Sequence, residues 1–112
     1  MGGGNEMAEI SELLDFSFAE DVVSEWDMYM EESYSIGEAT TQILDQYLGM
    51  LDEKETEALY VALALIQIPL EEIDVRVKRE INEMLGTKSL ETCFNKEMNI
   101  KPYLQQLKKH CR

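Results

Sequence analysis

The side chains that could act as nucleophiles or metal ligands are few in this sequence. Cysteine occurs only at Cys93 and Cys111, and the single histidine, His110, lies near the end of the chain. One histidine near the end of the chain argues against Ser/His/Asp and Cys/His nucleophilic sites, and the spacing of these three residues matches no zinc site. We therefore expect no cofactor and no metal. We interpret the cysteines as reduced thiols of a cytoplasmic protein, with a Cys93–Cys111 disulfide as the alternative.

Carboxylates are the reactive groups that the chain has in excess. It holds 23 Asp and Glu against ten Lys and Arg, a net charge of −13. A carboxyl that works as a general acid or base needs an apolar setting that raises its pKa. Asp15 and Asp45 lie nearest to apolar stripes, but neither has a visible catalytic partner. Because the sequence also lacks an EF-hand loop and a P-loop, we predict that the protein is not an enzyme.

The charges are distributed unevenly along the chain. Residues 1–74 hold 19 acids against one base, Lys54, which gives a net charge of −18. Residues 75–112 hold nine bases against four acids, which gives +5. So large an acidic excess repels itself and exceeds what solubility requires. The acidic half is therefore interpreted as a docking surface for a basic partner protein, because complementary charge speeds association and excludes wrong partners.

Nucleic-acid binding through the basic half is the weaker interpretation. A phosphate backbone is repelled by the charge of residues 1–74, and binding to it needs several clustered bases. We expect no nucleic-acid partner, and we expect the basic helices to lie against the acidic ones and partly neutralise them. No apolar run reaches the roughly 18 residues of a membrane helix, so we expect no membrane association. The bases considered for the patch are Arg76, Lys78, Arg79, Lys108, Lys109 and Arg112.

The elements that position these charges are predicted to be helices. The least polar stretch is Ala58–Leu70, where Gln67 is the only strongly polar side chain. A helix that is apolar on all sides is buried, so residues 58–68 are predicted to form the central helix of an all-α domain. We expect a single compact bundle of about five to six short helices over residues 6–112, after a flexible leader at residues 1–5.

Local signals predict the ends of the surrounding helices. Pro69 is expected to begin the helix after the central one, with Gly86 as its C-cap. Along that helix Glu72–Arg76 and Asp74–Lys78 are expected as i, i+4 ion pairs. Capping patterns predict helix starts at Ser17 with Glu20, Ser35 with Glu38, and Asp52 with Glu55. The expected ranges are Asn5–Asp15, Phe18–Glu32, Ile36–Leu51 and Pro69–Leu85, with a short helix from Ser89 and a last one from Pro102.

Within the acidic half, residues 26–34 (WDMYMEESY) interleave aromatic and methionine side chains with acids. Tyr and Trp anchors among charges are typical of interface hot spots. Trp26 shares the apolar stripe of its helix, so it is expected in the core rather than in contact with a partner. Met28 falls off that stripe, and Tyr34 lies at the helix boundary. The predicted partner-binding residues are Glu25, Asp27, Met28, Glu31, Glu32 and Tyr34.

In size, acidity and helical character, most of the chain resembles the bacterial toxin-immunity proteins. The resemblance rests on no sequence motif, and the adjacent tyrosine pair of the colicin-nuclease immunity proteins is missing. It implies a small cytoplasmic protein that neutralises a basic partner, such as a nuclease toxin, through an acidic helical surface. The alternative is a helical adaptor or regulatory module whose apolar groove takes a partner helix.

Overall fold

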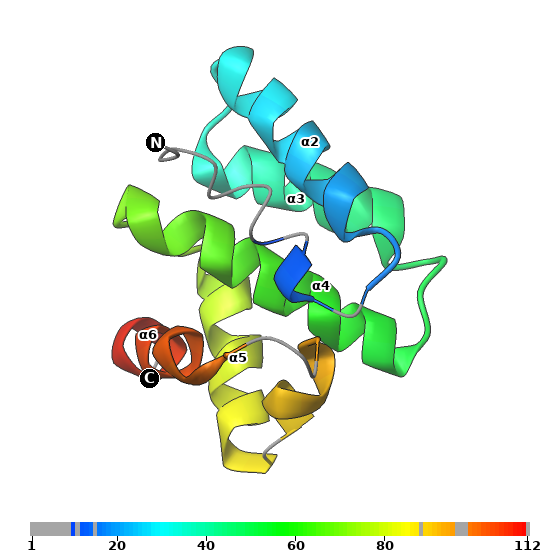
Figure 1. Ribbon diagram of the computed structural model, residues 1–112. Coiled ribbons are helices and arrows are strands. Elements are labelled where there is room, and N and C mark those ends of the chain that lie inside the picture. The colour runs from blue at the N-terminus through cyan, green and yellow to red at the C-terminus, as the bar shows by residue number, and fades with distance from the viewer. Residues whose placement is uncertain (1–9, 11, 15, 88, 96–98, 112) are drawn as a thin grey trace.

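Helix α4 (Glu53–Gln67) crosses the middle of the molecule, and the other elements pack on two sides of it (Figure 1). The structure is a computed structural model of the chain that describes residues 10, 12–14, 16–87, 89–95 and 99–111. From Ala58 to Gln67 every residue except the half-buried Tyr60 is buried. The prediction of a central apolar helix is therefore confirmed.

The described residues form five α-helices and two 3-10 helices, which confirms the all-α prediction. Helices α2 (Ala19–Glu31) and α3 (Ile36–Tyr47) lie on one side of α4 (Figure 1). On the other side lie α5 (Val75–Thr87), the 3-10 helix η2 (Ser89–Cys93) and α6 (Lys101–Cys111). A second 3-10 helix, η1 (Ile68–Leu70), follows α4 directly.

The N-terminal segment lies mostly outside the described residues. Residues 10, 12 and 13 are helical, and Ile10, Leu13 and Leu14 are buried. Leu14 forms an isolated antiparallel bridge with Phe94, so this segment is held against the chain that follows η2. The rest of the helix predicted over residues 5–15, and the boundary of a leader at residue 5, remain predictions.

The capping boxes predicted for α3 and α4 are confirmed. Ser35 Oγ accepts the backbone N–H of Glu38 at 3.1 Å, and the Glu38 carboxylate accepts the N–H of Ser35 at 3.0 Å. Asp52 and Glu55 form the same reciprocal pair at 2.8 and 3.2 Å. Helix α3 nevertheless ends at Tyr47 rather than at residue 51, which leaves a short connection before α4.

The capping box predicted at Ser17 is absent. Helix α2 begins at Ala19, and its N-cap is Phe18, which makes no side-chain capping bond. Aromatic packing holds this turn instead, since the Phe18 ring centre lies 6.0 Å from that of Phe16 and 5.8 Å from that of Tyr47. The prediction was wrong because a tertiary contact outweighed a local signal.

The connection between α4 and α5 also differs from the prediction. Pro69 lies in the 3-10 turn, Glu71 has a positive φ of 61°, and α5 begins only at Val75. The Gln67 side chain explains the difference, because its Oε1 accepts the backbone N–H of Asp74 at 2.8 Å. This bond closes a compact turn and leaves Leu70, the last residue of the least polar stretch of the sequence, 46% exposed.

The charges at the start of α5 pair within the turn. The Asp74 carboxylate accepts the backbone N–H of Arg76 at 2.9 Å and bonds its guanidinium at 2.9 and 3.0 Å. Partial burial raises the pKa of Asp74, but the bonds from Arg76 outweigh it and hold this pKa below its ordinary value. Neither predicted i, i+4 pair occurs among the described ion pairs. Gly86 is not a C-cap either, because α5 continues to Thr87.

Gln67 is the centre of a buried polar network. Among the described residues only Thr40 and Gln67 are buried polar side chains. Gln67 Nε2 donates to Thr40 Oγ1 at 2.9 Å, and the Thr40 hydroxyl donates to the carbonyl of Ile36 at 2.7 Å. Because Gln67 Oε1 bonds Asp74, one side chain of α4 connects α3 to the start of α5. An amide that is bonded through both its nitrogen and its oxygen fixes the relative position of the elements that it joins.

Replacing Gln67 with leucine should destabilise the fold. The variant leaves the buried side of the α4–α5 turn without an acceptor for the N–H of Asp74. An unsatisfied buried group costs about 1–3 kcal/mol, so Gln67→Leu should lower the free energy of unfolding in urea by about 2 kcal/mol. The matched control is Gln105→Leu on the exposed face of α6, which should change it by less than about 0.5 kcal/mol. Equal effects of the two variants would contradict a structural role for the network.

The two thiols should be unreactive in the folded protein. Cys93 and Cys111 are free and buried, and burial raises the pKa of each to about 11. Because the thiolate is the reactive form, each thiol at pH 8 should react about a hundredfold more slowly than an exposed cysteine. Labelling with an aromatic disulfide reagent, followed by absorbance, should show both thiols reacting fast only in denaturant. Fast labelling of either thiol in buffer would contradict its burial.

Candidate functional site

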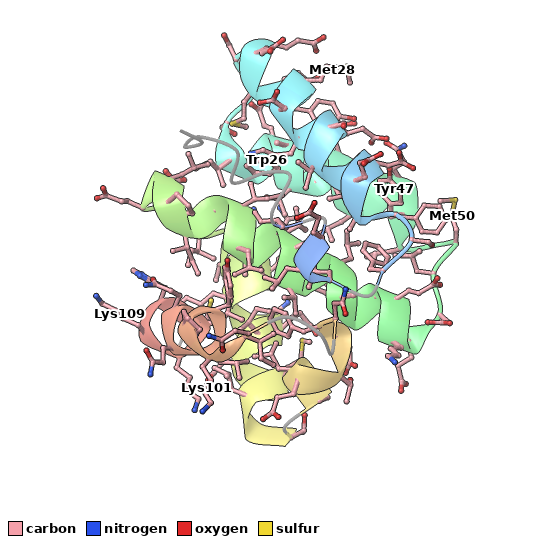
Figure 2. All side chains as sticks on the ribbon, viewed as in Figure 1. Trp26, Met28, Tyr47, Met50, Lys101 and Lys109 are labelled. Atoms are coloured by element: carbon pink, nitrogen blue, oxygen red, sulfur yellow. The ribbon has the colours of Figure 1, made fainter. Side chains whose placement is uncertain are left out.

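The outer face of α2 brings together four of the six predicted partner-binding residues. Asp27, Met28, Glu31 and Glu32 are exposed, and Figure 2 shows Met28 at the rim of the molecule, away from α4. Residues three and four positions apart share one side of a helix, so these side chains form a continuous surface. Glu20 and Asp21, about two turns earlier in α2, extend this surface. We call this surface the acidic face: Glu20, Asp21, Asp27, Met28, Glu31 and Glu32.

In the part of the chain that the structure describes, no base forms an ion pair with the acidic face. Neither α2 nor α3 contains Lys or Arg, and no described ion pair involves an acid of either helix. The exposed bases of α6 lie beyond α4, where Figure 2 shows Lys101 and Lys109 on the side of the molecule away from Met28. Of the described bases, Arg76 alone bonds α3, through a 3.2 Å bond from Nη2 to the carbonyl of Gly37. The basic helices therefore do not cover the acidic ones, contrary to our expectation.

Glu25 has a structural role rather than a place on the acidic face. It is half-buried and turned towards α3, where its Oε2 accepts the Tyr47 hydroxyl at 2.8 Å and Gln46 Nε2 at 3.1 Å. Burial, together with the bond to Glu25, raises the pKa of Tyr47 above its ordinary range. The other carboxylate oxygen of Glu25, Oε1, is buried and accepts no described hydrogen bond. Glu25 thus joins α2 to α3 and has little freedom to meet a partner.

Tyr34 and Glu32 line a shallow polar hollow at the turn from α2 to α3. The Tyr34 ring lies 5.0 Å from the Tyr29 ring and is half-buried by this contact. The hollow has a volume of about 520 Å³, and α3 contributes Glu38 to its lining. The bonds to Ser35 lower the pKa of Glu38, so this carboxyl is charged at neutral pH. The hollow therefore offers carboxylates to a basic side chain at the end of the acidic face.

A second hollow beside the acidic face could not be found from the sequence. It has a volume of about 260 Å³ and is mostly apolar. Trp26, which is in the core as expected, forms part of its wall, and Leu70 forms part of its exposed rim. The lining combines three segments that are distant in the chain: Ile10, Trp26, Asp27, Met30, Leu65, Ile66, Pro69 and Leu70.

The described residues offer little support for other kinds of site. They contain no cluster of His, Cys, Asp and Glu that could hold a metal ion. Asp45 is exposed, and Asp15 lies outside the described part of the chain. In the basic patch predicted as an alternative nucleic-acid site, Arg76 forms an ion pair with Asp74, and Arg112 lies outside the described residues. The other four bases of that patch are exposed: Lys78, Arg79, Lys108 and Lys109. None of the described helices has the length and hydropathy needed to cross a bilayer.

Comparison with known proteins gives no family for this chain. No family model matches the sequence, and neither a curated protein nor a solved structure matches it at a significant level. The function is therefore inferred from the surfaces described above.

Alanine substitutions should distinguish Glu25, which stabilises the fold, from the exposed acids of α2. Glu25→Ala leaves the hydroxyl of the buried Tyr47 without its acceptor, so it should lower the free energy of unfolding by about 1–2 kcal/mol. Asp27→Ala removes an exposed carboxylate with no described hydrogen bond and should change it by less than about 0.5 kcal/mol. Urea denaturation followed by circular dichroism measures both. The assignment of Glu25 to the fold fails if the two variants are equally stable.

Proposed function

We propose that the protein is a non-catalytic acidic inhibitor that binds and neutralises a basic partner protein through the acidic face. The observation that carries the proposal is the exposure of five carboxylates along one side of α2 and at its C-cap, with no base in α2 or α3. In a monomer this charge only weakens the fold through repulsion. Opposite a basic partner, the same charge becomes attractive and contributes to recognition.

The shape of the acidic face supports a partner with a basic cleft. Helix α2 has 13 residues and is about 20 Å long. Its carboxylates therefore form a narrow row on a convex rod, which fits a groove better than a flat surface. Proteins that cleave nucleic acids have such grooves, lined by Lys and Arg that contact phosphates. A nuclease toxin is accordingly the partner class that we favour, and the resemblance to toxin-immunity proteins agrees with this.

Faster association is the expected advantage of this arrangement. Charges separated by more than about 8 Å are screened at physiological salt, so the carboxylates act together mainly when the partner is close. Electrostatic steering can raise association rates by about 10-fold to 1,000-fold. For an inhibitor that must capture a toxin before it acts, a fast association is as useful as a slow release. We also propose that the protein works in the cytoplasm, where its two free thiols stay reduced.

A helical adaptor is the second candidate function, and the apolar hollow beside Asp27 favours it. An adaptor that binds mainly through apolar contacts would show an affinity that barely responds to ionic strength. The inhibitor, by contrast, should bind faster and more tightly as the salt concentration falls.

Neutralising the acidic face should slow association with the basic partner. The partner is first recovered by affinity capture at low salt and elution at high salt. The triple variant Asp27→Asn, Glu31→Gln and Glu32→Gln should then associate about tenfold more slowly in stopped-flow or surface-binding kinetics at low ionic strength. Its association rate should also depend less steeply on salt. If the partner is a nuclease, a larger excess of the variant should be needed to block DNA cleavage.

A second triple variant provides the matched control. Glu72→Gln, Glu83→Gln and Glu91→Gln removes the same charge from exposed positions outside α2 and α3, and it should leave the association rate within about twofold of the wild type. If both triple variants slow association equally, only the net charge matters and the acidic face is wrongly assigned. If neither variant changes the rate or its salt dependence, the proposed function is wrong.

A further inference from the structure

The apolar hollow beside the acidic face is an open depression between α2, the end of α4 and η1. Seven of the eight described residues that line it are apolar, and they include the buried Trp26 and the half-exposed Leu70. Trp26 extends from α2 on the side that faces α4 (Figure 2). Large apolar side chains at a rim are normally covered in a globular protein. The turn that Gln67 imposes on residues 68–74 leaves Leu70 uncovered here.

The volume of the hollow sets the size of its occupant. At about 260 Å³ it is smaller than most sites for cofactors or drug-sized ligands, which begin at about 300 Å³. It is larger than the roughly 150 Å³ cavity that holds a benzene molecule. One large apolar side chain, such as Phe, Leu or Met, therefore fits, whereas a whole helix face does not.

The charge around the hollow determines which residues are favoured on either side of the side chain that enters it. Among the described residues of the lining, Asp27 is the only polar one, and it also belongs to the acidic face. A side chain that enters the hollow therefore has a carboxylate beside it and Glu31 one turn further along α2. Neighbouring residues of the bound segment are favoured when they are Lys or Arg, and Asp or Glu at those positions is repelled.

We propose that the hollow binds a single large apolar side chain of the basic partner, from a segment in which Lys or Arg flank that side chain. This inference rests on the proposed function and adds an anchor to it. The acidic face speeds the encounter, and the buried anchor slows dissociation, as hot-spot residues in pockets do at other interfaces. The partner is thereby distinguished from basic proteins that lack an apolar side chain at the corresponding position.

Trp26 makes the proposal testable with synthetic peptides. It is the only tryptophan of the chain, so its fluorescence reports directly on the hollow. The probes are the capped peptides Lys-Lys-Phe-Lys-Lys and Lys-Lys-Ser-Lys-Lys, titrated into the full-length protein. The Phe peptide should bind about tenfold to a hundredfold more tightly than the Ser peptide, because it buries one aromatic side chain. Only the Phe peptide should shift the emission of Trp26.

Two variants locate the binding. Leu70→Ser removes an exposed part of the rim and should weaken the Phe peptide about tenfold, with no change for the Ser peptide. The control is Met50→Ser, which alters another exposed apolar side chain in the connection between α3 and α4, 58% exposed and absent from the described lining. It should change neither affinity. Circular dichroism of both variants verifies that they fold.

Several results would overturn the inference. Equal affinity of the two peptides means that the hollow does not bind the Phe side chain, and that only the charges of the acidic face attract the peptides. Binding of the Phe peptide only to a full-length Met7→Ser variant means that the chain's own N-terminal segment occupies the hollow. A change in Trp26 emission with protein concentration alone means that a second copy does. The triple variant of the acidic face tests the proposed function separately, because it leaves every apolar residue of the hollow in place.

Discussion

A buried side-chain amide must have hydrogen-bond partners, and the position of Gln67 at the end of α4 imposes this requirement on the middle of the fold. Both ends of the amide are satisfied by elements that are distant in sequence, Thr40 in α3 and the backbone of Asp74 before α5. Apolar contacts alone would allow helices to slide or rotate, because they have no preferred direction. The directional bonds of Gln67 select one arrangement, and the exposed rim at Leu70 is a consequence of it.

The same arrangement separates charge. Because α4 lies between the two halves, most bases of α5 and α6 lie away from the acids of α2 and α3 (Figure 1), and Arg76 is the described base that reaches α3. The molecule therefore has an acidic pole and a basic pole rather than a neutralised surface. Repulsion among the acids destabilises the fold, but the same acids concentrate a negative electrostatic field on one side of the molecule. Such a distribution orients the molecule as it approaches a charged partner, before any contact is made.

Features encoded locally could be predicted from the sequence, and features that depend on distant contacts could not. The all-α class, the buried helix and the boxes at Ser35 and Asp52 follow from periodicity and spacing over a few residues. The start of α2 was mispredicted because Phe18 packs on Tyr47 of another helix. The start of α5 was mispredicted because Gln67 binds Asp74 across the turn. Of the site, the exposed row on α2 was predictable, whereas the role of Glu25 and the apolar hollow required the folded chain.

The side chains of Asp27, Met28 and Glu31 make no described hydrogen bond or ion pair, whereas Glu25 on the inner flank of the same helix makes two. The outer positions of α2 are therefore free to mutate with little loss of stability, while the inner ones are constrained by α3. Mutations on such a helix can change which partner is bound without changing the fold. Related chains that face different partners are expected to vary along this outer row and to retain the amide and the carboxylate that hold the bundle together.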